Sequence, residues 1–139
     1  MAELTADRQV STGSGTSAEE VGRAVFERLS GWSPDQPPAE DELWPAYWDL
    51  DRIESIEADG SVFVGEAGLR RKAEWWDGQF EIVRYAVEGP FVGGSGFSLM
   101  FDLDAKHKAS GEVTSMKEVG VYTVKDGKIV REEFMPLVG

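Results

Sequence analysis

The chain has 139 residues, of which 14 are Lys or Arg and 26 are Asp or Glu, so its formal charge is -12, and it contains no cysteine. The lack of cysteine excludes disulfide scaffolds, thiolate zinc sites and cysteine nucleophiles, and the negative charge disfavours binding to nucleic acids or anionic membranes. A chain of this length is expected to form one domain with its own hydrophobic core.

The first 16 residues contain no apolar run, so they predict neither a secretion signal nor a membrane anchor. Their Ser, Thr and Gly content predicts a disordered lead-in, followed by one domain over residues 17–139. Cytoplasmic residence is therefore the expected location.

The first helical pattern begins with a capping box, in which Ser17 is followed three residues later by Glu20. Apolar residues then recur at four-residue spacing until Gly31, a residue typical of helix ends. The pattern predicts a helix over residues 18–30.

Two further helices are predicted before the long strands. An aromatic stripe favours a helix over residues 40–48, which Pro45 should shorten or kink. Residues 66–79 have the spacing of a single buried helical face. That face consists of Leu69, Ala73, Trp76 and Phe80.

Alternating side chains and turn-forming glycines indicate the strands. A first strand is expected over residues 52–58. Longer ones are expected at about 81–88, 97–104, 112–125 and 128–135. Helices followed mainly by antiparallel strands are typical of an α+β fold, with the helices packed on one face of a curved sheet.

The last two strands are predicted to form a hairpin around a type I′ turn at Asp126-Gly127, because both residues tolerate positive φ. Counting outward from Lys125 opposite Lys128 pairs Tyr122 with Arg131. One face then carries Glu118, Tyr122, Arg131 and Glu133. The other carries Val119, Val121, Val130 and Phe134, with Lys117 and Glu132. The first face carries the candidate site residues, but the second face is more apolar. Either face could therefore lie under the helices.

Several segments carry a resemblance to a known family. They are residues 55–58 (SIEA), 74–76 (EWW), 88–91 (EGPF) and the hairpin 118–134. Together they resemble the SnoaL-like branch of the NTF2-like superfamily, with its ketosteroid isomerase and polyketide cyclase-like fold. The resemblance implies an α+β cone, in which three N-terminal helices pack on a strongly curved, mainly antiparallel sheet around a deep pocket. It also implies a homodimer.

The resemblance does not imply one reaction, because the superfamily includes isomerases, cyclases, dehydratases and epoxide hydrolases. Its cyclases and dehydratases typically use Asp and His, whereas the only histidine here, His107, lies beside a turn that is expected to be exposed. The first-helix tyrosine of the isomerases is replaced by apolar residues such as Phe26. A histidine-dependent mechanism is therefore not expected.

Carboxylates are the remaining candidates for acid-base chemistry. Glu118 and Glu57 are the expected general acid or base, since enclosure among apolar side chains raises a carboxyl pKa. Arg131 would keep one of them ionised or anchor an anionic substrate. Tyr122 would donate a hydrogen bond to a developing oxyanion. No metal or cofactor is expected.

Aromatic and neighbouring side chains are the expected ligand contacts. Trp48 and Trp75 are predicted to line the pocket, because indoles combine an apolar ring with a hydrogen-bond donor. Trp76 is expected in the core, and Trp75 is about 100° around the helix from it, at the pocket rim. Met116 and Glu133 share the predicted hairpin face and complete the set.

Two classes of function remain open. The first is a cofactor-independent isomerase, cyclase or hydratase that acts on a small apolar carbonyl compound. The alternative is a non-catalytic module of the same fold, which binds a small ligand or only dimerises. In that case Glu118, Arg131 and Glu133 would form a structural ion-pair network. A homodimer formed through sheet faces is expected in both cases.

Overall fold

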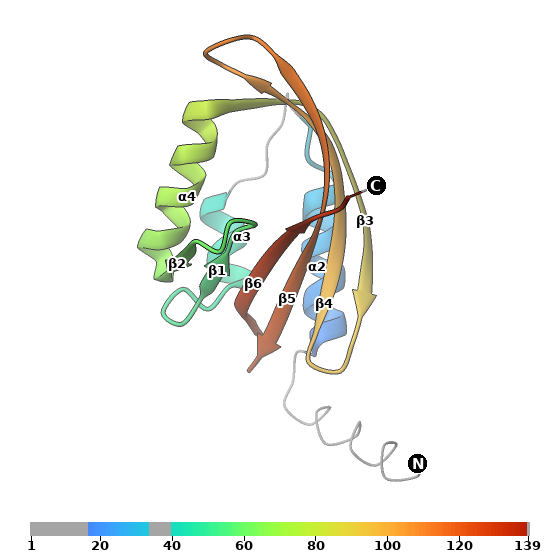
Figure 1. Cartoon of the computed structure of the whole chain (residues 1–139). Helices are drawn as coiled ribbons and strands as arrows, with labels where there is room; N and C mark the ends of the chain where they lie inside the picture. Colours follow the sequence, from blue (N-terminus) through green and yellow to red (C-terminus); the bar gives the residue numbers. More distant parts are fainter. Residues whose placement is uncertain (1–16, 34–39, 139) are drawn as a thin grey trace.

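The computed structural model of the chain describes residues 17–33 and 40–138 (Figure 1). The expected lead-in over residues 1–16 lies outside the described residues, as does most of the loop before residue 40. The helices are α2 (Ala18–Ser30), α3 (Glu40–Tyr47) and α4 (Gly65–Gln79). The strands are β1 (Glu54–Ile56), β2 (Val62–Val64), β3 (Phe80–Val92), β4 (Gly96–His107), β5 (Val113–Lys125) and β6 (Lys128–Pro136).

The capping box predicted for α2 is confirmed. The Glu20 backbone N–H donates to Ser17 Oγ, and the Ser17 N–H donates to the Glu20 carboxylate, both at 3.2 Å. Gly31 follows the helix as its C-cap. These bonds satisfy backbone groups that would otherwise lack partners at the helix ends.

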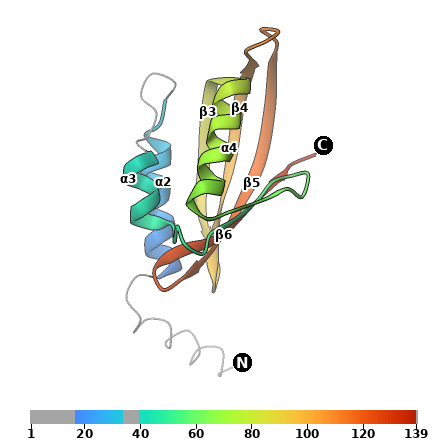
Figure 2. The same cartoon turned by 90° about the vertical axis from the view of Figure 1, so that its left-hand side faces the viewer.

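The six strands form a single curved sheet in the order β2-β1-β6-β5-β4-β3. All neighbouring pairs are antiparallel except β1 and β6, which run parallel. Strand β2 was not expected, because three residues are too few for an alternating pattern. Helix α4 follows β1 and β2, so the helices do not all precede the sheet. Figures 1 and 2 show the helices on one side of the long strands.

The predicted turn at the end of the hairpin is confirmed, but the predicted register is wrong. Asp126 and Gly127 have φ values of 53° and 78°, and Lys125 pairs with Lys128. Beyond Val124 the ladder shifts by one residue, because β6 contains a bulge at Val130.

The bulge exchanges the faces of β6. Tyr122 pairs with Glu132, and Gly120 pairs with Phe134, so these four residues share a face. Arg131 lies opposite Thr123, on the other side of the sheet. Because the bulge lies in β6, it does not alter the alternation of side chains along β5.

The inner face of the sheet and the helices form the core. Alternate residues of β4 are buried there, including Leu99, which is fully inaccessible to solvent. Helix α2 contributes Val21 and Val25, also fully buried. The inner face is therefore the one that carries Glu118, Tyr122, Glu132 and Phe134.

Candidate functional site

A cavity lies between the helices and the inner face of the sheet. Its volume is about 810 Å³, within the range of small-molecule sites. Aromatic rings form much of its wall. They belong to Trp32, Trp44, Trp48, Trp76, Phe80, Tyr85, Phe101, Tyr122 and Phe134.

Glu132 is a buried carboxylate in this wall, and both of its oxygens accept hydrogen bonds. Trp48 Nε1 donates to Oε1 at 2.8 Å, and Ser55 Oγ donates to Oε2 at 2.7 Å. The strands bring both donors into place, since Ser55 is the parallel partner of Glu132 and Trp48 forms a bridge with Ile129. A buried carboxylate is costly to leave unpaired, so these bonds hold Glu132 in one position.

Lys72 of α4 supplies the positive charge beside Glu132. Its Nζ lies 2.6 Å from Glu57 Oε2 and 3.6 Å from Glu132 Oε2, and it donates to Ser55 Oγ at 2.8 Å. The same ammonium lies 4.0 Å from the ring centroid of Phe134. We call Lys72, Glu57, Ser55, Glu132 and Trp48 the Lys72 network. It contains one cation and two carboxylates, so it keeps a net negative charge.

Sequence reasoning does not find Lys72, Ser55 or Glu132. A signal for Lys72 exists, because it lies three residues after Leu69 and four before Trp76, close to the buried face of the helix. A lysine on such a face needs an acceptor in the interior. Glu132 could not be found, because the bulge that turns it inward leaves no pattern in the sequence.

Glu118 is a cavity carboxyl without a hydrogen-bond partner among the described residues. It is half-buried and lies opposite Phe101 in the ladder between β4 and β5. Burial raises the pKa of Glu118, the charge of Glu57 raises it further, and Lys72 lowers it. A carboxyl with a raised pKa is better matched to proton transfer near neutral pH than an exposed glutamate.

Tyr122 presents a protonated hydroxyl to the cavity. Burial raises the pKa of Tyr122 well above its usual value, and the charge of Glu132 adds to this effect. A phenol that remains protonated can donate a hydrogen bond to an oxyanion. Its ring stacks on Phe97, with the centroids 4.9 Å apart.

Gly120 provides the space in which the Tyr122 hydroxyl lies. A Cβ on Gly120 would lie 2.9 Å from the hydroxyl oxygen and 3.1 Å from Phe134 Cε1. Since Gly120 lies between Tyr122 and Glu118 along β5, the ring leans toward the Glu118 end of the strand. Gly120 therefore helps to position the hydroxyl.

Gly120→Ala should destabilise the protein by about 1–3 kcal/mol, because the added methyl group overpacks this contact. Urea unfolding would measure the change. Gly78→Ala is the matched control, since no atom lies within 4 Å of the added Cβ. If both variants unfold at the same urea concentration, Gly120 does not provide the space that the Tyr122 hydroxyl occupies.

Of the predicted aromatic contacts, Trp48 lines the cavity and Trp75 does not. Trp75 is 56% exposed, and its ring lies 6.0 Å from that of Trp76. Trp76, expected in the core, lines the cavity instead. Met116 is half-buried and packs against the hydrophobic core. Glu57 does not line the cavity, but it pairs with Lys72 and its charge raises the pKa of Glu118.

Arg131 and Glu133 lie on the outer face of the sheet, contrary to the predicted register. They form an ion pair of 3.4 Å, and both side chains are at least one-third exposed. Neither lines the cavity. The expected contact between Arg131 and Glu118 is therefore replaced by the electrostatic influence of Lys72.

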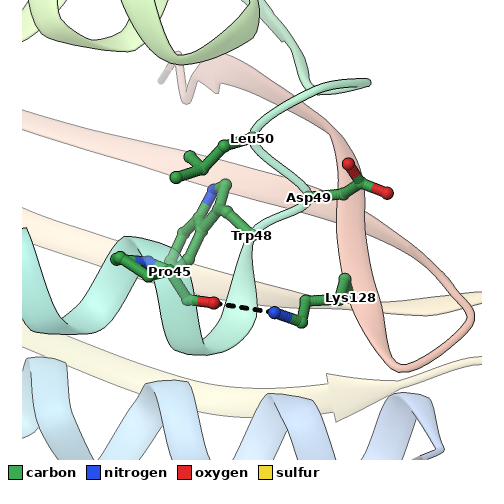
Figure 3. A pocket seen from close by; sticks show the side chains of 5 residues that line it. All are labelled: Pro45, Trp48, Asp49, Leu50 and Lys128. Atoms are coloured by element: carbon green, nitrogen blue, oxygen red, sulfur yellow. Dashed lines mark hydrogen bonds between the residues drawn. The ribbon is translucent and has the colours of Figure 1, made fainter.

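A smaller cleft of about 310 Å³ lies beside the large cavity (Figure 3). Trp48 lines both, with its indole N–H directed to Glu132. The other lining residues include Pro45, whose carbonyl oxygen accepts a 2.7 Å hydrogen bond from Lys128 Nζ. The smaller cleft contains no group comparable to Glu118, so the large cavity is the candidate site.

Within residues 17–33 and 40–138, no group of three or more His, Asp or Glu side chains is arranged to hold a metal ion. No helix in this part of the chain is long and apolar enough to cross a membrane.

Comparisons with known proteins agree with this architecture. A family model for the SnoaL-like domain matches residues 40–135. Among curated proteins no significant match was found. A proposed SnoaL-like polyketide cyclase from Mesorhizobium loti is 37% identical, with a TM-score of 0.71 over 84% of this chain and 96% of its own.

More distant structures share the fold alone. A proposed SnoaL-like polyketide cyclase from Jannaschia sp. CCS1 is 15% identical, with a TM-score of 0.70 over 88% of each chain. A Catenulispora acidiphila protein with a ketosteroid isomerase-like fold, in complex with trimethylamine, is 10% identical, with a TM-score of 0.60 over 83% of each chain. Because the family model covers most of the sequence and the Mesorhizobium protein is 37% identical over 84% of this chain, this chain belongs to the SnoaL-like domain family.

Proposed function

We propose that the protein is a cofactor-independent enzyme that moves a proton on a small apolar carbonyl compound, as an isomerase, cyclase or hydratase does. One observation carries this proposal: a carboxyl group with a raised pKa, Glu118, faces an aromatic cavity without a hydrogen-bond partner in the described residues. The other buried carboxylate, Glu132, has both oxygens occupied and is held as part of the scaffold.

The reaction would begin when Glu118 removes a proton from the carbon next to the carbonyl group. The electron pair of that C–H bond forms an enolate, whose oxygen accepts a hydrogen bond from the Tyr122 hydroxyl. The protonated Glu118 can then return the proton at another carbon, which completes an isomerisation. In a cyclisation, the enolate carbon instead attacks a second carbonyl group of the same molecule.

The similarity to the proposed polyketide cyclase from Mesorhizobium loti supports a carbonyl compound as the substrate. The size of the cavity supports a substrate of one to a few fused rings.

Proton exchange in a model ketone tests the proposal without knowledge of the natural substrate. 2-Tetralone is a flat, apolar ketone whose α-protons exchange with D2O, and NMR follows their loss. The wild-type protein should accelerate this exchange above the buffer rate. Binding of 2-tetralone without any acceleration would support the alternative, a non-catalytic small-ligand-binding protein that uses the same cavity.

We further propose that the outer face of the sheet forms a homodimer. Val121 and Met135 lie on this face and are 37% and 46% exposed. Charged groups surround them, including the pair of Arg131 and Glu133. A second copy would cover this mixed surface through a two-fold contact.

Light scattering at micromolar concentration should therefore give about twice the chain mass of 15.3 kDa. Val121→Lys should shift the mass toward the monomer, because it places a charge at the centre of the contact. A wild-type mass equal to that of one chain would exclude this dimer.

A further inference from the structure

The wall of the cavity carries more acidic than basic side chains. It contains four carboxyl side chains and two lysines, namely Asp77, Glu81, Glu118 and Glu132 against Lys72 and Lys108. Both ammonium groups already have partners. Lys72 is held by the Lys72 network, and Lys108 Nζ donates to the backbone carbonyl of Asp77. A ligand that carries a carboxylate or phosphate would thus meet an excess of negative charge in this wall.

Glu118 differs from the other deep carboxylate because nothing in the described residues pairs with it. Phe101 lies opposite it in the sheet, and the rings of Tyr122 and Phe134 line the same cavity. Lys72 compensates the charge of an ionised Glu118 only in part, since burial and Glu57 outweigh it, and a ligand cation hydrogen-bonded to the carboxylate would offset the remaining cost.

The aromatic wall already contacts cations. Lys72 Nζ lies 4.0 Å from the ring centroid of Phe134, and the guanidinium carbon of Arg70 lies 5.7 Å from that of Trp44. Both rings line the cavity. Aromatic faces are electron-rich, so the remaining rings of the wall can likewise favour a positively charged group on a ligand.

We infer that the cavity binds a flat apolar compound that carries an ammonium group, with the nitrogen against Glu118 and the rings against the aromatic wall. The inference names a ligand class for the site of the proposed function, and it rests on the same placement of Glu118 in the cavity. A carboxylate has two oxygens, so one can accept from the ammonium while the other faces an adjacent C–H bond.

A matched series of indole compounds tests the inference. Tryptamine, tryptophol and indole-3-propionate share a ring and a two-carbon arm, and end in a cation, a neutral hydroxyl and an anion. Calorimetry at low salt should rank them in that order, with tryptamine binding about tenfold more tightly than tryptophol. Equal affinities, a preference for the anion or no binding of any member would overturn the inference.

Glu118→Gln locates the preference. This variant should lose the charge preference and bind tryptamine no more tightly than tryptophol. Glu133→Gln is the control, because it removes the same charge from the outer face of the sheet and should keep the preference. Circular dichroism confirms that both are folded, and a Glu118→Gln protein that still prefers tryptamine would exclude Glu118 as the cation site.

The two proposals fail separately. If the charge preference is absent but wild-type protein accelerates exchange in 2-tetralone, acid-base catalysis stands and the ammonium ligand does not. If tryptamine is preferred but no exchange is accelerated, the site binds cations without catalysing proton transfer.

Discussion

Glu118→Gln should slow the exchange of 2-tetralone α-protons by at least about 100-fold relative to the wild type, because the amide cannot accept a proton. The side chains have nearly the same shape, so the cavity and the binding of the ketone should be retained. The remaining rate should equal that of buffer. NMR in D2O measures the rate, and a direct titration measures ketone binding.

The pH dependence has a defined direction. The wild-type rate should rise with pH as Glu118 loses its proton, and the midpoint should lie above 4.5, because burial raises the pKa of this carboxyl. Glu118→Gln should lack this titration. Glu133→Gln, on the outer face, should keep both the rate and the midpoint. Wild-type exchange in the Glu118→Gln protein would contradict the catalytic assignment.

The free energy of unfolding should fall as pH rises, whereas the exchange rate rises. The folded protein binds the Glu118 proton more tightly than the unfolded chain, whose carboxyl titrates near 4.5. As pH rises through the raised pKa, this group therefore lowers the free energy of unfolding. Glu118→Gln removes the effect, so the variant should be at least as stable as the wild type at pH 7 in urea unfolding.

Lys72→Met should lower the free energy of unfolding by about 3 kcal/mol, because it leaves two carboxylates without their neighbouring positive charge. Glu132 is 6% exposed and would lose its nearby positive charge. Glu57 would lose an ion pair of 2.6 Å. Urea unfolding at pH 7 measures the loss.

Arg23→Met is the matched control for Lys72→Met. It also removes the cation of an ion pair, the 2.7 Å pair with Glu19, but this pair is exposed on α2 and should contribute less than about 1 kcal/mol. Lys72→Met should also move the exchange midpoint to higher pH, since Lys72 lowers the pKa of Glu118. Equal stability losses in the two variants would show that the Lys72 network is not an interior ion cluster.

Much of the fold could be predicted from local patterns. The capping box placed the start of α2, and the glycine-containing turn placed the end of the last hairpin. Each of these signals depends on residues close in sequence. Strand β2 and the parallel pairing of β1 with β6 could not be predicted, because they depend on contacts between distant segments.

Parts of the candidate site could also be predicted from local patterns, and other parts could not. Glu118 and Tyr122 were correctly placed on one face, because alternation along β5 is regular. Arg131 and Glu133 were assigned to that face by counting across the turn, and a single bulged residue invalidates such counting. Trp75 and Trp76 were exchanged, because a helical stripe that lines a cavity has the same spacing as one that fills a core.

The bulge at Val130 also determines how this hairpin must be aligned with those of relatives. In a relative whose last strand lacks the extra residue, the ladder is regular, and a one-residue gap belongs at Val130. Without that gap, the alignment would match cavity-facing residues of the relative to Arg131 and Glu133 of this chain. Residue roles can therefore be transferred along this strand only by structural superposition, since the residues beyond the bulge exchange orientation while the sequences still look continuous.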